Sequence, residues 1–234
     1  MRFINHVEKF VPDLKAREIL DLGCGRGYDL IEFVKYGYNA AGIDTNQEYL
    51  DFAKNIAQKQ GLAPKLYWGE AEHLPFRENS FDFIFASEVT EHVEDPEKVL
   101  SECARVLRSG GKMYMSFHNR YGIYDHHYHL YFINWMPRLL AEKIISFLGK
   151  SKNDNQKAGV QKLSDMHYFT YDSAVNLLKK YNFDYIDSRE EQIKNPGLSD
   201  RKVLTIIAKL KLSNSLIFLL KKFYGTFHFI AIKP

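Results

Sequence analysis

Short apolar segments alternate along the chain with longer segments in which apolar residues recur every three or four positions. The short segments are typical of strands, and the longer ones are typical of helices that bury one face. The predicted strands are 18–23, 39–44, 65–70, 81–89, 112–119 and, at the end, 227–234. The predicted helices are 28–37, 46–61, 96–107 and about 202–224. Between residues 119 and 171 the alternation breaks, and it resumes with a helix at 172–182 followed by 183–193. Strands and helices joined by short glycine-bearing turns predict an α/β class with a doubly wound parallel sheet.

The length and composition indicate one folded unit with extra material. The chain has 234 residues, against a yardstick of about 150 for one domain, so a large domain or a domain with an insertion is expected. With 45% hydrophobic and 26% charged residues, a disordered, collagenous or fibrous chain is excluded. Two cysteines, Cys24 and Cys103, cannot form a disulfide framework, which indicates a reducing cytosol. No signal peptide or apolar stretch of membrane-spanning length is evident, so we expect a cytoplasmic protein.

Charge and aromatic residues are unevenly spread. The net charge of +3 combines residues 1–137, with 15 basic and 20 acidic side chains, and residues 138–234, with 17 and 9. The excess of basic side chains in residues 138–234 indicates either a solvated face or a surface that attracts an anionic partner. One short stretch holds four of the nine histidines and a group of aromatic residues. These aromatic residues are Tyr114, Phe117, Tyr121, Tyr124, Tyr128, Tyr131, Phe132 and Trp135.

The sharpest local motif joins the first predicted strand to the first helix. It runs from Asp21 to Gly27 as DLGCGRG, and its glycines allow a ligand to approach the backbone closely. Asp44 ends the next strand, where a carboxylate can take both hydroxyls of a ribose. The glycine motif alone is weak, because many nucleotide folds contain it. A site for NAD is the alternative, although the third glycine of the dinucleotide fingerprint is missing.

Several motifs in order make the interpretation specific. ILDLGCGRGYDL, GIDTN, GEAEHLPF, FDFIFASEVTEHV and RVLRSGGKMYMSF follow one another over residues 17–120, and this resembles class I S-adenosylmethionine-dependent methyltransferases. The resemblance implies a Rossmann-like seven-stranded sheet with S-adenosylmethionine as cofactor. It places Gly23 and Gly25 at the methionine end, Asp44 at the ribose, and Ala71 and Glu72 by the adenine. Glu70 stands where many relatives have Asp. The predicted cofactor-binding residues are Asp21, Gly23, Cys24, Gly25, Gly27, Asp44, Glu70, Ala71, Glu72 and Ser87.

A candidate metal site follows the fourth strand. If Ser87 begins a helical turn, then Glu88, Glu91 and His92 share one face of it. Two carboxylates and an imidazole together favour a divalent cation with oxygen-rich ligation, and Mg²⁺ suits such ligands. The alternative is an ordinary polar turn in which His92 caps the following helix.

A resemblance to two metal-dependent groups extends this set. The ExxEH turn is similar to that of ubiquinone-pathway O-methyltransferases and small-RNA 2′-O-methyltransferases, where it binds Mg²⁺ with a further histidine after the fifth strand. Residues 165–171 resemble that later motif. They imply His167 as the fourth ligand, ahead of His118, His126, His127 and His129. Mg²⁺ would lower the pKa of an acceptor hydroxyl, with His92 and His167 as catalytic residues. A histidine acting as general base without metal is the alternative.

The segment 120–166 is predicted to be an insertion that recognises the acceptor, within a single domain spanning 1–234. Its first part resembles methyltransferases encoded with polysaccharide-synthesis genes, and its Tyr, Trp and His side chains suit a glycan. Residues 130–148 would alternatively contact a membrane surface, or simply pack as a lid on the sheet.

The sequence therefore predicts an S-adenosylmethionine-dependent O-methyltransferase acting on a hydroxyl of a sugar or lipid-linked glycan. The acceptor is alternatively a catechol-type quinone precursor or an RNA 2′-hydroxyl. RNA is disfavoured because no separate binding module is evident and the net charge is modest. A cofactor-binding pseudo-enzyme that acts as a partner subunit is the alternative from another class.

Overall fold

The computed structural model describes residues 4, 7–12, 14–150, 161–195, 216, 223 and 225–234. Its strands are β1 (Glu18–Leu22), β2 (Asn39–Asp44), β3 (Lys65–Trp68), β4 (Phe81–Ala86), β5 (Leu107–His118), β6 (Tyr124–Asp125), β7 (Leu130–Tyr131), β8 (Asp184–Asp187) and β9 (Thr226–Ile232). Its α-helices are α2 (Tyr28–Lys35), α3 (Gln47–Lys59), α4 (Pro96–Val106), α5 (Arg138–Phe147), α6 (Tyr171–Lys180) and α7 (Ser188–Lys194). Short 3₁₀ turns are η1 (Leu14–Ala16), η2 (Ile133–Trp135) and η3 (Leu163–Asp165). Apart from residues 216 and 223, the helix predicted at 202–224 lies outside the described residues.

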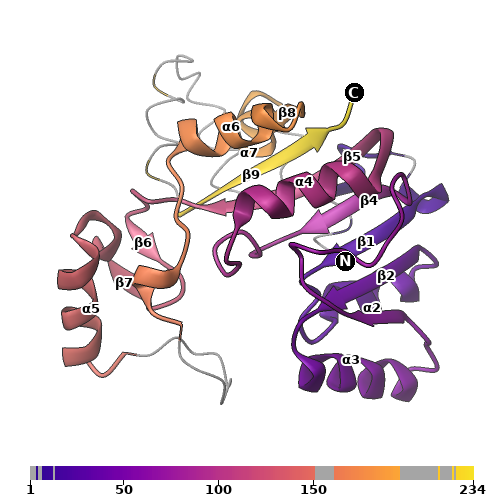
Figure 1. Ribbon diagram of the computed structural model, residues 1–234, viewed down its shortest axis with the longest axis horizontal. Helices are drawn as coiled ribbons and strands as arrows, with labels where there is room; N and C mark the ends of the chain where they lie inside the picture. Colours follow the sequence, from indigo (N-terminus) through magenta and orange to yellow (C-terminus); the bar gives the residue numbers. More distant parts are fainter. Residues whose placement is uncertain are drawn as a thin grey trace.

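Seven strands form one sheet in the order β3-β2-β1-β4-β5-β9-β8 (Figure 1). The first five in this order run parallel, and β9 runs antiparallel to both of its neighbours. This confirms the predicted Rossmann-like seven-stranded α/β class. The sheet is not parallel throughout, because β9 enters the space between β5 and β8 from the carboxyl end of β5, where Thr226 pairs with His118.

Each face of the sheet has its own apolar core, as alternation along the strands requires. On β4, Ile84 and Ala86 join the core under α4 and α6, whereas Phe83 and Phe85 join the core under α2. A strand buried on both faces explains the uninterrupted apolar stretch 83–86 within the predicted strand 81–89.

Capping residues fix where two helices begin. Asn46 accepts a hydrogen bond from the Tyr49 amide at the start of α3. Asp95 accepts hydrogen bonds from the Glu97 and Lys98 amides at the start of α4, and Pro96 at its first position suits that start. The helix α3 follows β2 and α4 follows β4, so the segments that lead into both helices leave the carboxyl ends of parallel strands, where ligands bind in such sheets.

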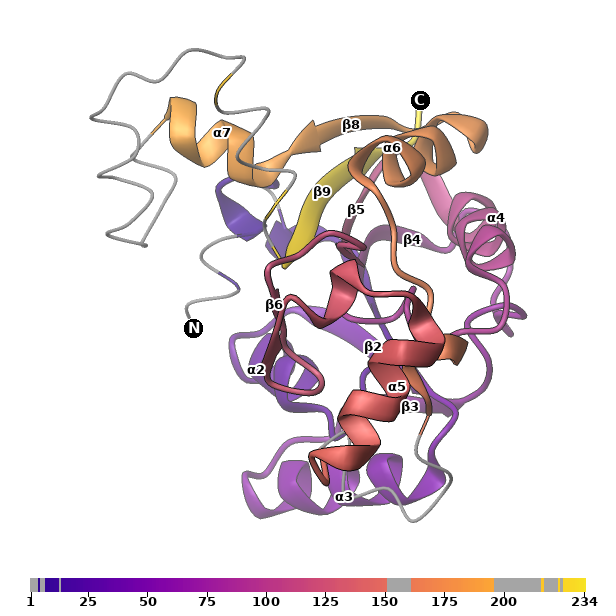
Figure 2. The same cartoon turned by 90° about the vertical axis from the view of Figure 1, so that its left-hand side faces the viewer.

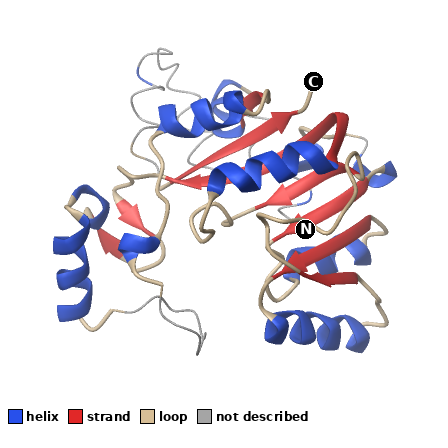
Figure 3. Cartoon of the chain, viewed as in Figure 1, coloured by secondary structure: helices blue, strands red, loops and turns tan. Residues whose placement is uncertain are grey.

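The insertion forms a small unit of its own. It contains the β6–β7 hairpin, η2, α5 and η3, which lie beyond the carboxyl end of β5 in two perpendicular views (Figures 1 and 2). Figure 3 shows the view of Figure 1 with helices and strands in different colours, and the insertion again lies apart from the main sheet. Its side chains pack into a separate apolar core of Tyr128, Ile133, Ala141, Ile145, Leu163 and Met166. A bridge between Asn119 and Phe169 brings its two ends together beside the sheet.

Within the described part of the chain, none of the helices has the length and apolar character needed to cross a bilayer.

Candidate active site

The glycine-rich turn after β1 leaves one stretch of backbone open. Gly23, Gly25 and Gly27 have φ angles of 68°, 51° and 72°, in the left-handed region that favours glycine. A Cβ on Gly23 would lie 2.8 Å from Val89 Cγ2, and one on Gly27 would lie 2.6 Å from Ala53 Cβ. A Cβ on Gly25 would meet no atom within 4 Å. The outer glycines are thus required for packing, while Gly25 faces space that a ligand could fill.

Asp44 is held beside this turn by its own hydrogen bonds. Its Oδ2 accepts from the Gly25 amide and its Oδ1 from the Asn46 amide, both at 2.8 Å. Asp44 is half-buried, and each oxygen retains a second lone pair. The carboxylate is therefore oriented at the ends of two adjacent parallel strands, in the place where a ribose diol is bound in doubly wound sheets.

Asp21 is buried below the same turn. Burial, and then the charges of Asp29 and Asp44, raise the pKa of Asp21 well above its usual range. Its Oδ2 has no hydrogen-bond partner among the described residues. A cationic group of a ligand near the turn would offset this accumulation of negative charge.

The other predicted cofactor residues occupy different positions. Glu72 accepts a hydrogen bond from the Glu94 amide at 2.9 Å and so supports the turn before α4. Glu70 is exposed, with Oε2 3.5 Å from His73 Nδ1. Cys24 is buried, and burial raises the pKa of its thiol, so it is not a reactive cysteine. Ala71 and Ser87 are half-buried. The cofactor role of all five stays a prediction.

The segment after β4 is a turn and not the helical turn that the sequence suggested. The backbone of Glu88 has a φ of 57°, and a left-handed residue cannot continue a right-handed helix. The Glu88 amide donates to Ser116 Oγ at 2.7 Å, and the His92 amide donates to the Val89 carbonyl. Glu88, which is exposed, therefore does not share a helical face with Glu91 and His92.

Glu91 lies instead at the centre of a group of histidines. Its side chain is fully buried, and its Oε1 lies 3.0 Å from His118 Nε2, 3.7 Å from His92 Nε2 and 3.9 Å from His127 Nε2. His118 ends β5, next to β4 in the sheet, and His127 comes from the insertion. The ligand atoms of Glu91, His118 and His127 all lie within 4.8 Å of one another, so these residues could hold a metal ion.

The charges in this group depend on burial and on each other. Burial alone would raise the pKa of Glu91, but its interactions with His118 and His92 outweigh burial and hold that pKa below the usual value. Burial, and then the charge of His118, lower the pKa of His127 to about 3. The imidazole of His127 is therefore neutral at physiological pH, the form in which histidine binds metals.

His167, the predicted fourth ligand, contacts the backbone of the turn. Its Nε2 lies 3.2 Å from the carbonyl oxygen of Glu94, and its amide donates to the Glu91 carbonyl. These contacts tie His167 to the backbone of the turn. The signal that could have favoured His118 is its place at the carboxyl end of β5, because neighbouring parallel strands bring their carboxyl ends together.

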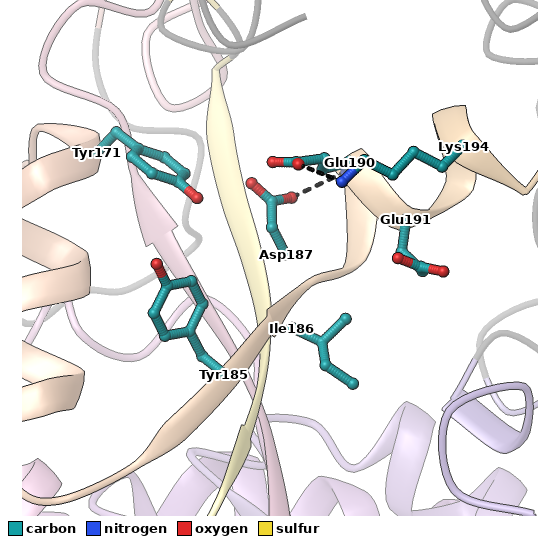
Figure 4. Close-up of a pocket in the computed structure, with 7 residues that line it drawn as sticks. All are labelled: Tyr171, Tyr185, Ile186, Asp187, Glu190, Glu191 and Lys194. Carbon is teal, nitrogen blue, oxygen red and sulfur yellow. Dashed lines mark hydrogen bonds and ion pairs between the residues drawn. The ribbon is translucent and has the colours of Figure 1, made fainter. Parts of the chain in front are cut away.

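A separate pocket lies at the far edge of the sheet, between α6, β8 and α7 (Figure 4). It is lined by Tyr171, Tyr185, Ile186, Asp187, Glu190, Glu191 and Lys194. Lys194 pairs with Glu190 at 2.7 Å, and burial and the charge of Asp187 raise the pKa of Tyr171. None of the predicted site residues lines this pocket, and it carries no part of the candidate active site.

Comparisons with known proteins agree with the glycine turn and the sheet. Residues 20–115 match the family described as "Methyltransferase domain". The chain is 33% identical over 117 residues to a ubiquinone biosynthesis O-methyltransferase of Coxiella burnetii, an alignment that covers 50% of each protein. It is 36% identical over 113 residues to norajmaline N-methyltransferase of Rauvolfia serpentina, covering 47% of this chain and 38% of the relative.

A solved structure described as a SAM-dependent methyltransferase from Methanosarcina mazei matches 96% of both chains, with a TM-score of 0.60 and 22% identity. This similarity concerns the fold. The chain spans half of the length, or less, of the curated relatives described above.

Proposed function

We propose that the chain, whose residues 20–115 match a methyltransferase domain, moves the methyl group of S-adenosylmethionine onto a hydroxyl group of an acceptor. The observation that carries the proposal is the contact between the Gly25 amide and Asp44 Oδ2. It joins an open glycine turn to an oriented carboxylate, as the binding of an adenosyl cofactor requires.

The reaction needs positioning and a proton acceptor. The hydroxyl oxygen attacks the methyl carbon in line with the carbon–sulfur bond, and the products are a methyl ether and S-adenosylhomocysteine. Much of the acceleration comes from holding the two reactants in this geometry. We assign proton acceptance to His92, because its Nδ1 lies 2.8 Å from Gln161 Oε1. An amide oxygen only accepts, so Nδ1 carries the proton and Nε2 is the basic nitrogen. His167 bonds the backbone of Glu91 and Glu94, on either side of His92, and we assign it the role of holding this turn in place.

We propose a sugar or lipid-linked glycan as the acceptor, recognised by the insertion. Aromatic side chains stand out from this unit, with exposed fractions of 50% for Tyr121, 67% for Tyr131 and 48% for Trp135. Such rings stack on the apolar faces of sugars. They lie on the part of the chain beyond the carboxyl end of β5 (Figure 2), the end at which a methyl donor is expected.

A lipid-linked acceptor would bring the insertion to a membrane surface. Leu139, Leu140 and Phe147 are exposed on α5, as is its C-cap residue Leu148, while Ala141 and Ile145 on the other side of the helix are buried. A helix with one exposed apolar face and a lysine, Lys143, beside it suits the interface of an anionic bilayer. We propose peripheral contact through residues 130–148 on these grounds.

Magnesium is not part of the proposed function. The sequence-based set of Glu88, Glu91, His92 and His167 does not meet as one group among the described residues, where the ligand atoms that come together are those of Glu91, His118 and His127, and His167 Nε2 lies against a carbonyl oxygen. The donors that do meet are one carboxylate and imidazoles, whereas Mg²⁺ prefers oxygen ligands.

A catechol-type quinone precursor is the second candidate acceptor. The observation in its favour is the 33% identity to a ubiquinone biosynthesis O-methyltransferase, across the cofactor-binding half of this chain. Both candidates use the same cofactor site and the same proton acceptor.

The test is formation of S-adenosylhomocysteine by the purified chain with S-adenosylmethionine and a panel of glycans, lipid-linked glycans, catechols, amines and RNA. We expect acceptor-dependent product with a glycan. Asp44→Asn should reduce cofactor affinity by about tenfold or more, since it removes a charged hydrogen-bond acceptor. Asp51→Asn, on exposed α3 surface, is the matched control. Tight cofactor binding with no transfer to any acceptor would contradict the proposal and favour a cofactor-binding partner subunit.

A further inference from the structure

We propose that Glu91, His118 and His127 form a binding site for a divalent transition-metal ion of the Zn²⁺ class. The inference rests on the proposed function for the role of the ion beside the acceptor. Binding itself can be measured without any methyl transfer. Three segments meet at this site: the turn after β4, the end of β5 and the insertion loop between β6 and β7.

The spacing of the three donors suits one ion. Tetrahedral ligands at about 2.0–2.1 Å from Zn²⁺ stand about 3.3 Å from one another. The distances from Glu91 Oε1 to His118 Nε2 and His127 Nε2 are 3.0 and 3.9 Å, on either side of that value. The three ligand atoms lie within 4.8 Å of one another, so side-chain adjustments of up to about 1.5 Å would complete the coordination.

The polar atoms at the centre of the group contact one another and few other groups. Both carboxylate oxygens of Glu91 and Nε2 of His118 are buried and have no hydrogen bond among the described residues. Glu91 Oε1 lies 3.0 Å from His118 Nε2, an ion pair when His118 carries a proton. A buried ionised carboxylate is costly unless it is paired. The histidines around Glu91 are its pairing groups here, and a bound cation would take that place while the imidazoles turn to ligands.

A hydrogen-bond chain aims His127 at the same point. The Tyr168 hydroxyl lies 2.7 Å from Asp125 Oδ2 and 3.0 Å from His127 Nδ1. Asp125 is a buried carboxylate, which only accepts, so the Tyr168 hydroxyl donates to it and accepts from Nδ1–H. The neutral imidazole then has its lone pair on Nε2, which faces Glu91. Metal-binding histidines are oriented in this way by an outer partner on the other ring nitrogen.

The donor types select the ion. Two imidazoles and one carboxylate suit Zn²⁺, Fe²⁺ and Co²⁺, whereas oxygen-only sets suit Mg²⁺ and Ca²⁺. Three protein ligands also leave a coordination position open, as in catalytic rather than structural zinc sites. His92 Nε2, 3.7 Å from Glu91 Oε1, stays at the rim of the site as the proton acceptor.

Cobalt titration followed by visible absorption tests the proposal directly. Protein freed of metal with a chelator and titrated with Co²⁺ should develop the absorption bands of a low-symmetry site at one equivalent. Zn²⁺ should displace the cobalt, and millimolar Mg²⁺ should not. His127→Ala should weaken Co²⁺ binding by about tenfold or more. His126→Ala, which changes the adjacent histidine outside the group, should not.

Tyr168→Phe tests the orienting chain with less disturbance of packing. Losing the hydroxyl should weaken Co²⁺ binding by about 10- to 100-fold, as for other outer-shell partners. Tyr124→Phe is the matched control, because the Tyr124 hydroxyl bonds His129 Nδ1 at 2.9 Å in the same insertion.

Three outcomes would overturn the inference. These are the absence of a one-equivalent cobalt spectrum, equal Co²⁺ affinity in wild type and His127→Ala, and a loss of affinity in His167→Ala but not in His127→Ala. Assays of S-adenosylhomocysteine formation separate this inference from the proposed function. Cobalt binding without methyl transfer supports the site and counts against the function, and transfer by a protein that binds no cobalt does the reverse.

Discussion

At the residue scale, the site depends on positions where a small change in backbone or charge has a defined effect. Gly25 has no neighbour in the space where a side chain would point, although its amide donates to Asp44 and α2 begins at Tyr28. Empty space around a glycine in a crowded turn indicates room kept for a ligand. Asp44 and Gly25 could be predicted because strand, turn and helix follow in a short stretch of sequence.

Gly25→Ala and Gly37→Ala form a matched pair that isolates this effect. Both glycines have positive φ angles, 51° and 81°, and open space beside them. An alanine at either should cost about 1 kcal/mol of unfolding free energy, because its Cβ disfavours the left-handed region. Only Gly25→Ala should also weaken binding of S-adenosylhomocysteine, which calorimetric titration would measure. Equal affinity in the two variants would show that the ligand does not approach this turn.

At the element scale, the least predictable part of the site was the turn between β4 and α4. Periodicity over Ser87–His92 fits one helical turn, and nothing local signals that Glu88 adopts a left-handed backbone. Tertiary contacts decide the matter, since the Glu88 amide bonds Ser116 on the neighbouring strand. His127 could not be assigned from sequence for a similar reason. Its partner Tyr168 is 41 residues away, and only the packing of the insertion brings them together.

Hydrogen bonds at the amino ends of β1, β4 and β5 give a prediction about the pH dependence of stability. Asp82 on β4 accepts from the Glu18 amide on β1 at 2.9 Å and from Arg108 on β5 at 2.6 Å. Burial alone would raise the pKa of Asp82, but these two donors outweigh it and hold the pKa below its usual value. The stabilisation is therefore full above the unfolded-state pKa and is lost as the pH falls through the lower folded-state pKa.

Asp82→Asn should lower the free energy of unfolding at pH 7 by about 1 kcal/mol, because the ion pair is partly exposed. The difference from wild type should shrink below about pH 4. Urea unfolding at several pH values measures it, with the exposed Asp184→Asn as control. A difference that persists unchanged at pH 3 would contradict the assignment.

At the scale of the whole molecule, the described residues form three apolar cores, one on each face of the sheet and a third in the insertion. The sheet was predictable because its strands and helices alternate in sequence. The position of the insertion unit was not, since it depends on the bridge between Asn119 and Phe169 and on contacts that start from His118 and His127.

The exposed face of α5 tests the proposed membrane contact. Leu139 and Phe147 are 76% and 89% exposed, so replacing both with Glu should leave the thermal midpoint of unfolding nearly unchanged. The same change should abolish flotation with anionic vesicles, because it removes apolar area and adds negative charge. Wild type that fails to float with such vesicles would contradict peripheral contact. Ile145→Glu, on the buried side, should instead destabilise the insertion.

The place of β9 has a consequence for synthesis on the ribosome. β8 pairs in the sheet only with β9, among the described strands, and β9 also lines the length of β5 up to His118. A nascent chain can form the five parallel strands and the glycine turn before β9 has emerged. The edge of β5 stays unpaired during that interval, which exposes it to wrong partners. Translation pauses after residue 118 should therefore favour aggregation. The backbone of His118 should be held in place only once it pairs with Thr226 of β9.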